Sequence, residues 1–241
     1  ILLSCVLLLG LFSQPSIASH DKVYEITILH TNDFHARFRP ISKYDNNCSQ
    51  KNNAKGKCFG GTARLISAVE DARSRHSNTI LLDGGDQFQG TLFYNLYKGK
   101  VAAEMMNKLG YDGMAVGNHE FDDGPENLRA FMDSVNFPVL MANANIDMEP
   151  ELKGKLHKST TLYRNNQKIG LIGVVTEEVV DISAPGDNII FTDAVAAVQS
   201  EVDFLTEAGV NKIILLSHSS YEIDKMIAAN TTGVDVIVGG H

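Results

Sequence analysis

The sequence predicts an α/β sandwich with a largely parallel or mixed sheet. Short runs rich in Ile, Leu and Val alternate with helical patterns along almost the whole chain. The 241 residues are 44% hydrophobic, which is enough for one sizeable core, and they contain no repeat, low-complexity segment or linker. The net charge of −8 argues against a nucleic-acid-binding surface, which is normally basic.

The elements follow in order from apolar periodicity and from the residues that stop each run. Gly110 and Gly209 stop two of the helices, and Asn165-Asn166 forms the turn of a hairpin. Strands are predicted at 23–30, 79–83, 112–116, 138–142, 212–216 and 234–238, with the hairpin at 162–175. Helices are predicted at 60–76, 101–109, 127–135, 194–208 and 221–229.

The N-terminus has the character of an export signal. Residues 1–12 are an apolar run too short to span a bilayer comfortably, and Ser16-Ile17-Ala18 offers small residues for a signal peptidase. We therefore expect a signal peptide over residues 1–18, and a buried N-terminal helix is the alternative. With no initiating Met and no basic segment before it, the recorded chain is expected to begin inside the signal.

Removal of the signal leaves two cysteines, Cys48 and Cys58, in a polar stretch. In an exported protein such a pair is most simply a disulfide, whereas a metal–thiolate site would lack a nearby His. Asn47 and Asn230 lie in glycosylation patterns. The lysines of this stretch are interpreted as a solvated face: Lys51, Lys55 and Lys57.

Residues 117–122, Gly-Asn-His-Glu-Phe-Asp, follow the strand at 112–116 and precede a helix. Asn118 offers an amide oxygen to a cation, and His119 is suited to proton transfer near neutral pH. Asp122 is three residues further on, where it can hydrogen-bond the ring on a helical turn. We expect His119 to donate a proton to a reacting oxygen or leaving group, with Asp122 holding its tautomer.

Five strand ends present the same chemistry, and ligands bind at the carboxyl ends of strands in α/β sheets. Asp33 and His35 are two residues apart, so on an extended segment they would face the same way. Oxygen and imidazole ligands without thiolate suit Zn, Mn or Fe, and they are too many for one tetrahedral zinc. We expect two metal ions sharing Asp86. The predicted ligands are Asp33, His35, Asp86, Asn118, His218 and His241.

The motifs resemble those of the calcineurin-like metallophosphoesterases, and their exact sequences are most similar to those of the 5'-nucleotidase/apyrase family. They are HTNDFH at 30–35, GGD at 84–86, GNHEFD at 117–122, SH at 217–218 and GGH at 239–241. The resemblance implies a four-layer αββα sandwich of mixed β-sheets flanked by helices. It assigns Asp33 and His35 to one metal, Asp86 as the bridge, and Asn118, His218 and His241 to the other. It also implies a His119/Asp122 dyad and a loop disulfide between Cys48 and Cys58.

The resemblance also raises expectations about cofactor and domains. Zinc is the expected metal, with Mn, Mg, Ca or Co as alternatives. Family members continue after Gly-Gly-His with Ser and a further polar ligand, and they carry a C-terminal domain that grips base and ribose. We therefore expect residues 19–241 to be a metallophosphoesterase catalytic domain that is incomplete at its C-terminus, in a partial sequence without the nucleotide-binding domain.

The function implied is a secreted or cell-surface phosphohydrolase acting on extracellular nucleotides, most simply a 5'-nucleotidase. An apyrase hydrolysing ATP and ADP is an alternative with the same catalytic domain, and a non-catalytic nucleotide binder is a third. The expected partner is a small-molecule nucleotide and not a nucleic acid. Membrane attachment would require an anchor beyond His241, and the sequence does not indicate an oligomeric state.

Overall fold

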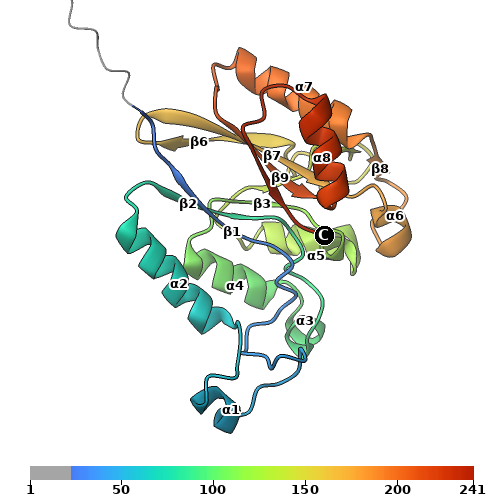
Figure 1. The fold of residues 1–241 in the computed structure, drawn as a ribbon. Helices are drawn as coiled ribbons and strands as arrows, with labels where there is room; N and C mark the ends of the chain where they lie inside the picture. The colour runs from blue at the N-terminus through green and yellow to red at the C-terminus, as the bar shows by residue number, and fades with distance from the viewer. Residues whose placement is uncertain (1–22) are drawn as a thin grey trace, which may run out of the picture.

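The computed structural model describes residues 23–241, so the predicted signal peptide lies outside the described residues. Two four-stranded sheets dominate the fold (Figure 1). The first is parallel throughout and has the order β1-β2-β3-β4: β1 (Thr27–Thr31), β2 (Thr79–Asp83), β3 (Gly113–Ala115) and β4 (Val139–Leu140). The second has the order β10-β9-β7-β6: β6 (Ser159–Arg164), β7 (Gln167–Val175), β9 (Ile213–His218) and β10 (Val236–Gly239).

In the second sheet β10, β9 and β7 run parallel, and β6 returns antiparallel to β7. The turn between β6 and β7 is Asn165-Asn166, with φ of 47° and 61°. Positive φ at both central residues is what a tight hairpin turn requires, and Asn tolerates it. The hairpin predicted at 162–175 is therefore confirmed.

The two sheets pack face to face. Ile80 and Leu82 of β2 point into a buried cluster with Leu171 of β7 and Leu216 of β9. Leu81, between them, points the other way into the cluster beneath the helices, as the alternation of a strand requires. The central strands β2, β7 and β9 are thus buried on both faces, which explains their nearly unbroken apolar sequence.

Helices cover the outer face of each sheet, and this completes the four-layer αββα arrangement expected from the sequence. On the first sheet lie α2 (Thr62–Arg75), α4 (Lys100–Leu109) and α5 (Gly124–Met132), and on the second lie α7 (Ala194–Glu207) and α8 (Tyr221–Asn230). Three short helices connect these elements: α1 (Gln50–Ala54), α3 (Leu92–Tyr97) and α6 (Val179–Ile182). A 3-10 turn, η1, covers His119–Phe121. A small two-stranded sheet is formed by β5 (Ala144–Asn145) and β8 (Ile190–Phe191).

The main elements match the predicted ones, but several bounds differ, α5 begins at Gly124 instead of residue 127, and α6, β5 and β8 were not predicted. The strand predicted from residue 23 begins only at Thr27, and the last strand begins at Val236. β9 extends to His218, so this residue ends the strand instead of following it. Helices α1 and α3 were not predicted, because five or six residues are too short for a periodic pattern.

Two further features concern the surface. Cys48 and Cys58 are joined by a disulfide bond, which closes the loop that carries α1. Both glycosylation candidates, Asn47 and Asn230, are exposed. Among residues 23–241, every helix is too short or too polar to span a bilayer.

Candidate active site and metal centre

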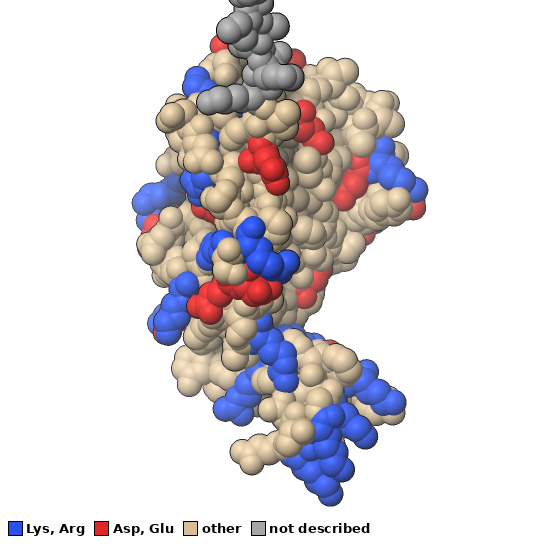
Figure 2. Space-filling view, turned by 60° about the vertical axis from the view of Figure 1, so that its left-hand side comes forward, with Lys and Arg blue, Asp and Glu red and all other residues tan. Residues whose placement is uncertain are grey.

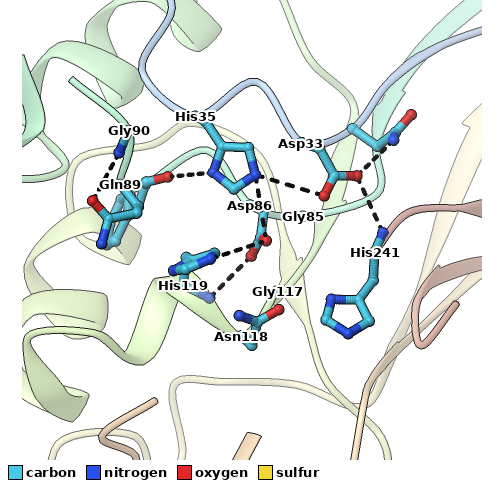
Figure 3. A network of polar contacts seen from close by, with 12 residues as sticks. Asp33, His35, Gly85, Asp86, Gln89, Gly90, Gly117, Asn118, His119 and His241 are labelled. Atoms are coloured by element: carbon cyan, nitrogen blue, oxygen red, sulfur yellow. Dashed lines mark hydrogen bonds and ion pairs between the residues drawn. The ribbon is translucent and has the colours of Figure 1, made fainter. Parts of the chain in front are cut away.

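The predicted site residues meet between the two sheets, at the carboxyl ends of their strands (Figure 3). Asp33 and His35 follow β1, Asp86 follows β2, and Asn118 follows β3, all in the first sheet. His218 ends β9 and His241 lies just beyond β10, both in the second sheet. The candidate residues therefore do not share the edge of one sheet, because the two packed sheets each contribute one side of the site.

The expectation that Asp33 and His35 lie on an extended segment is also wrong. Their φ angles are 50° and 48°, in the left-handed region that non-glycine residues rarely adopt. Backbone hydrogen bonds hold this shape: Asp33 N–H donates to Gly85 O and His35 N–H to Asp86 O, at 2.9 and 3.0 Å. Strained backbone of this kind is typical of functional sites, where the surrounding structure holds it in place.

Asp86 lies at the centre of the site. Its Oδ2 is 3.1 Å from His218 Nε2, 3.8 Å from His35 Nε2 and 4.0 Å from His119 Nε2. Its Oδ1 accepts the backbone N–H of His119 at 2.9 Å. Asn118 Oδ1 lies 3.2 Å from His218 Nε2, which brings the amide oxygen to the same centre.

The imidazoles of His35 and His218 are oriented by backbone carbonyls. Nδ1 of His35 lies 3.1 Å from Phe88 O, and Nδ1 of His218 lies 2.7 Å from Gly84 O. A carbonyl oxygen can only accept, so these bonds place a proton on Nδ1 and leave Nε2 as the ring atom that faces Asp86. Metal-binding histidines are typically oriented by this kind of hydrogen bond.

Asp33 and His241 close the side of the site opposite His119. Oδ2 of Asp33 accepts hydrogen bonds from Asn32 Nδ2 at 2.6 Å and from the backbone N–H of His241 at 3.1 Å. Oδ1 of Asp33 is 3.7 Å from His35 Nε2. The His241 ring lies against the His218 ring, with 5.1 Å between their centroids.

Two glycines allow the loops of the site to approach one another. A Cβ on Gly117 would lie 2.2 Å from Asp86 Oδ1, and a Cβ on Gly85 would lie 2.8 Å from both Gly117 N and His218 Nδ1. Gly85 also has a φ of 98°. No side chain fits at either position without displacing the central carboxylate or its neighbours.

Glu120 is a structural part of the site that the sequence analysis did not identify. Its carboxylate is fully buried and accepts four backbone N–H groups, from Asp86, Gln87, Phe88 and Gly117, at 2.7 to 3.1 Å. It therefore ties the loop after β2 to the loop after β3. Its place inside the 117–122 motif was a signal, but three of its four bonds span more than 30 residues and cannot be inferred from spacing.

His119 and Asp122 form the predicted pair. Nδ1 of His119 is 2.8 Å from Asp122 Oδ2 across the single turn of η1. Two side chains missed by the sequence analysis hold Asp122: Ser183 Oγ donates to its Oδ1 at 2.9 Å and Gln89 Nε2 to its Oδ2 at 3.0 Å. Nε2 of His119 remains free to face the centre.

The electrostatics reflect the concentration of carboxylates. Burial alone would lower the pKa of His218, but its hydrogen bond with Asp86 and the charge of Asp86 raise it to about 9. Contact with Asp33 is the largest cause that raises the pKa of His35. Burial tends to raise the pKa of Asp33, yet hydrogen bonds from His35 and Asn32 hold it below its ordinary value. The imidazoles of His35 and His218 therefore already face the carboxylates, and a bound cation could take the place of their protons.

The donor atoms fall into two groups that share Asp86. One group is Asp86 with His35 and His119, and the other is Asp86 with His218 and His241, each with its ligand atoms within 4.8 Å of one another. Asn118 adjoins the second group and Asp33 the first. Two groups around a common carboxylate fit a pair of divalent ions, and the oxygen and imidazole donors suit such ions.

Comparison with known proteins agrees with this geometry. A family model for calcineurin-like phosphoesterases matches residues 26–241. The chain therefore belongs to the calcineurin-like phosphoesterase family, in which a pair of divalent metal ions serves hydrolysis of phosphoesters.

Within that family the similarity is to 5'-nucleotidases. The chain is 46% identical to a 5'-nucleotidase of Diplobatis ommata over 225 residues, which are 90% of this chain and 37% of that protein. It is 42% identical to a human 5'-nucleotidase over 221 residues, 90% of this chain and 38% of that one. A 5'-nucleotidase precursor from Thermus thermophilus superposes with a TM-score of 0.81 at 37% identity, covering 89% of this chain and 41% of that one. The chain thus spans about two fifths of the length of these relatives.

Proposed function

We propose that this protein is a two-metal phosphohydrolase that releases phosphate from nucleotides, most simply from nucleoside 5'-monophosphates. The observation that carries the proposal is the central carboxylate of Asp86, which both groups of donor atoms share. The His119–Asp122 pair beside it supplies a proton donor. The similarity to 5'-nucleotidases supports the choice of substrate.

The ligands are proposed to divide as the sequence analysis expects. Asp33 and His35 would hold one ion, Asn118, His218 and His241 the other, and Asp86 would bridge them. The orientation of both Nδ1 atoms by backbone carbonyls supports His35 and His218 as Nε2 ligands. Zinc is the first candidate metal, and Mn, Mg, Ca or Co could occupy similar donors.

His119 is proposed as a proton donor and not as a ligand, although its Nε2 lies 4.0 Å from Asp86 Oδ2. Nδ1 is bonded to Asp122, so the ring presents Nε2–H when protonated, and it can donate to a phosphoryl oxygen or to the leaving ribose oxygen. Bound divalent ions would neutralise charge on the phosphoryl group and lower the pKa of a bound water. Asp122, held by Ser183 and Gln89, fixes the ring for this donation.

The proposed setting is secreted or on the outer cell surface. The predicted signal peptide over residues 1–18 supports export, and the Cys48–Cys58 disulfide supports an oxidising compartment. We further propose that residues 19–241 are the catalytic part of a longer enzyme, because the relatives are more than twice as long as the matched region.

The proposal is tested with the full-length protein and a panel of phosphate compounds. Phosphate release from AMP, ADP, ATP and a simple alkyl phosphate is measured with added Zn or Mn and after chelation. We expect metal-dependent release, with the highest kcat/KM for AMP. Preference for ADP and ATP would identify an apyrase instead. Tight nucleotide binding without turnover of any phosphoester would reject the hydrolase proposal.

A further inference from the structure

The charge of the chain is divided very unevenly. Residues 37–64, here called the basic tip, contain seven cationic side chains and a single acidic one, Asp45. The tip therefore nets +6 in a protein that nets −8, so all other residues together net −14. The cations are Arg37, Arg39, Lys43, Lys51, Lys55, Lys57 and Arg64.

The basic tip projects from the body of the molecule. It carries the short helix α1 at one end of the structure, well away from the paired sheets (Figure 1). In the space-filling view the Lys and Arg side chains gather on this projection, while acidic side chains lie on the body above it (Figure 2). The Cys48–Cys58 disulfide closes the loop, so the positive charge is presented by a constrained segment.

Most of these cations are not neutralised within the protein. Among residues 23–241, Arg37 is the one member of the seven with a carboxylate within ion-pair distance, that of Asp45 at 2.5 Å. Arg64 donates to Gly60 O and Asn53 Oδ1, both uncharged groups. The lysines of α1 and its flanks, Lys51, Lys55 and Lys57, are all exposed.

Large apolar side chains border the basic tip. A groove of about 400 Å³ runs between its first residues and α3, and it is lined by Arg37 and Arg39 together with Leu92 and Leu96. The two leucines are 73% and 72% exposed, and Tyr44 in the tip is 73% exposed. The leucines lie beside Arg37 and Arg39, and Lys43 lies over the ring of Tyr44, so this surface is both apolar and cationic.

We propose that the basic tip docks onto an anionic lipid bilayer. Positive charge on the tip complements the lipid headgroups, and Leu92, Leu96 and Tyr44 can enter the boundary between headgroups and acyl chains. The body nets −14 and would be repelled by the same surface. Because charges are screened over about 8 Å at physiological salt, acidic side chains of the body that lie farther than this from the bilayer would add little repulsion.

The apolar border is what favours a bilayer over a soluble polyanion. A sulfated polysaccharide would satisfy the lysines but would leave the exposed leucines in water. A bilayer would bind both the lysines and the leucines, because burial of apolar surface adds to the electrostatic attraction. The inference does not depend on the proposed hydrolase activity, because none of these side chains belongs to the site around Asp86.

The test is sedimentation of the full-length protein with vesicles. Vesicles of phosphatidylcholine containing about 30% phosphatidylserine are compared with pure phosphatidylcholine at about 0.05 and 0.5 M salt. We expect binding to the anionic vesicles at low salt and weaker binding at high salt. Each lysine near an anionic surface contributes about a fivefold gain in partitioning, so Lys51→Gln, Lys55→Gln and Lys57→Gln together should weaken binding about 100-fold.

Two further variants separate the bilayer from other partners. Leu92→Ser with Leu96→Ser keeps all charges, and it should weaken vesicle binding while leaving retention on heparin unchanged. The matched control is Lys153→Gln, Lys155→Gln and Lys158→Gln, an equal charge change on exposed lysines outside the tip, and it should bind vesicles nearly as the wild type does. Absence of vesicle binding, an equal loss in tip and control variants, or binding to heparin but not to vesicles would each overturn the proposal.

Discussion

The Glu120 carboxylate accepts the backbone N–H of Asp86 at 2.9 Å, and this contact helps to position the central carboxylate of the site. The same carboxylate accepts the N–H of Gly117, so the loops after β2 and β3 share one buried acceptor. Asp86 in turn accepts the N–H of His119. The central carboxylate of Asp86 and the proposed proton donor are thus held relative to each other by a residue whose own carboxylate binds backbone N–H groups.

Replacing Glu120 by Gln should destabilise the protein. Each carboxylate oxygen accepts two backbone N–H groups, and the amide NH2 of Gln would face two donors in place of one of these oxygens. Leaving two buried donors unsatisfied costs about 3 kcal/mol of unfolding free energy. Urea unfolding followed by circular dichroism measures this loss. Glu104→Gln, on the exposed face of α4, is the control, and an equally small effect of both changes would contradict the role given to Glu120.

His119→Ala should separate catalysis from metal binding. Loss of the proton donor should lower kcat for AMP about 10²–10⁴-fold, which is the usual contribution of general acid catalysis. The proposed ligands are untouched, so the bound-metal content measured by atomic emission should remain at two ions per chain. His76→Ala, an exposed histidine at the end of α2, should leave both quantities unchanged. Loss of metal in step with activity would make His119 a ligand instead.

Asp86→Ala and His218→Ala should differ in metal content. Asp86 belongs to both donor groups, so its removal should reduce the bound metal below one ion per chain. His218 belongs to one group only, so its removal should leave about one ion. Equilibrium dialysis followed by atomic emission gives both numbers. Equal stoichiometry in the two variants would show that Asp86 is not the shared ligand.

Asp83 should make the stability of the metal-free protein depend on pH. Burial raises the pKa of Asp83 to about 7, although Thr31, Gly85 and Gln87 donate hydrogen bonds to it. The folded state then binds the proton more tightly than the unfolded chain, whose Asp titrates near about 3.9. Its stabilising contribution is complete below a pH of about 4 and is lost as the pH rises through about 7.

The readout is the slope of unfolding free energy against pH, measured in chelator between about pH 4 and 7. Asp83→Asn cannot titrate, so its slope should be shallower than that of the wild type even if the variant is less stable at every pH. Identical slopes would show that Asp83 keeps an ordinary pKa in the folded protein.

Part of the site could be predicted because it is local in sequence. His119 and Asp122 are three residues apart, and one helical turn brings them within hydrogen-bond distance wherever the chain lies. The Asn165-Asn166 turn and the Cys48–Cys58 disulfide loop could be predicted for the same reason, because each spans few residues. Polar side chains directly after apolar runs indicated which strand ends contribute to the candidate site.

Other parts could not be predicted because they depend on contacts between distant segments. Asp33 and His35 adopt left-handed backbone conformations because their N–H groups bond to the loop after β2, some 50 residues away. Ser183 holds Asp122 from a distance of 61 residues in the chain. Helix α3 and its exposed leucines carry too short a pattern to be recognised from the sequence.

The motifs alone were enough to predict the αββα class and to place the candidate donor side chains near the ends of strands. The folded structure was needed to show which of the two sheets supplies each candidate donor, that Glu120 joins the loops after β2 and β3, and that the positive charge projects as a separate tip. The physical reason is that periodicity and turn chemistry act over a few residues, whereas the packing of one sheet on another is decided by buried contacts between residues far apart in the chain.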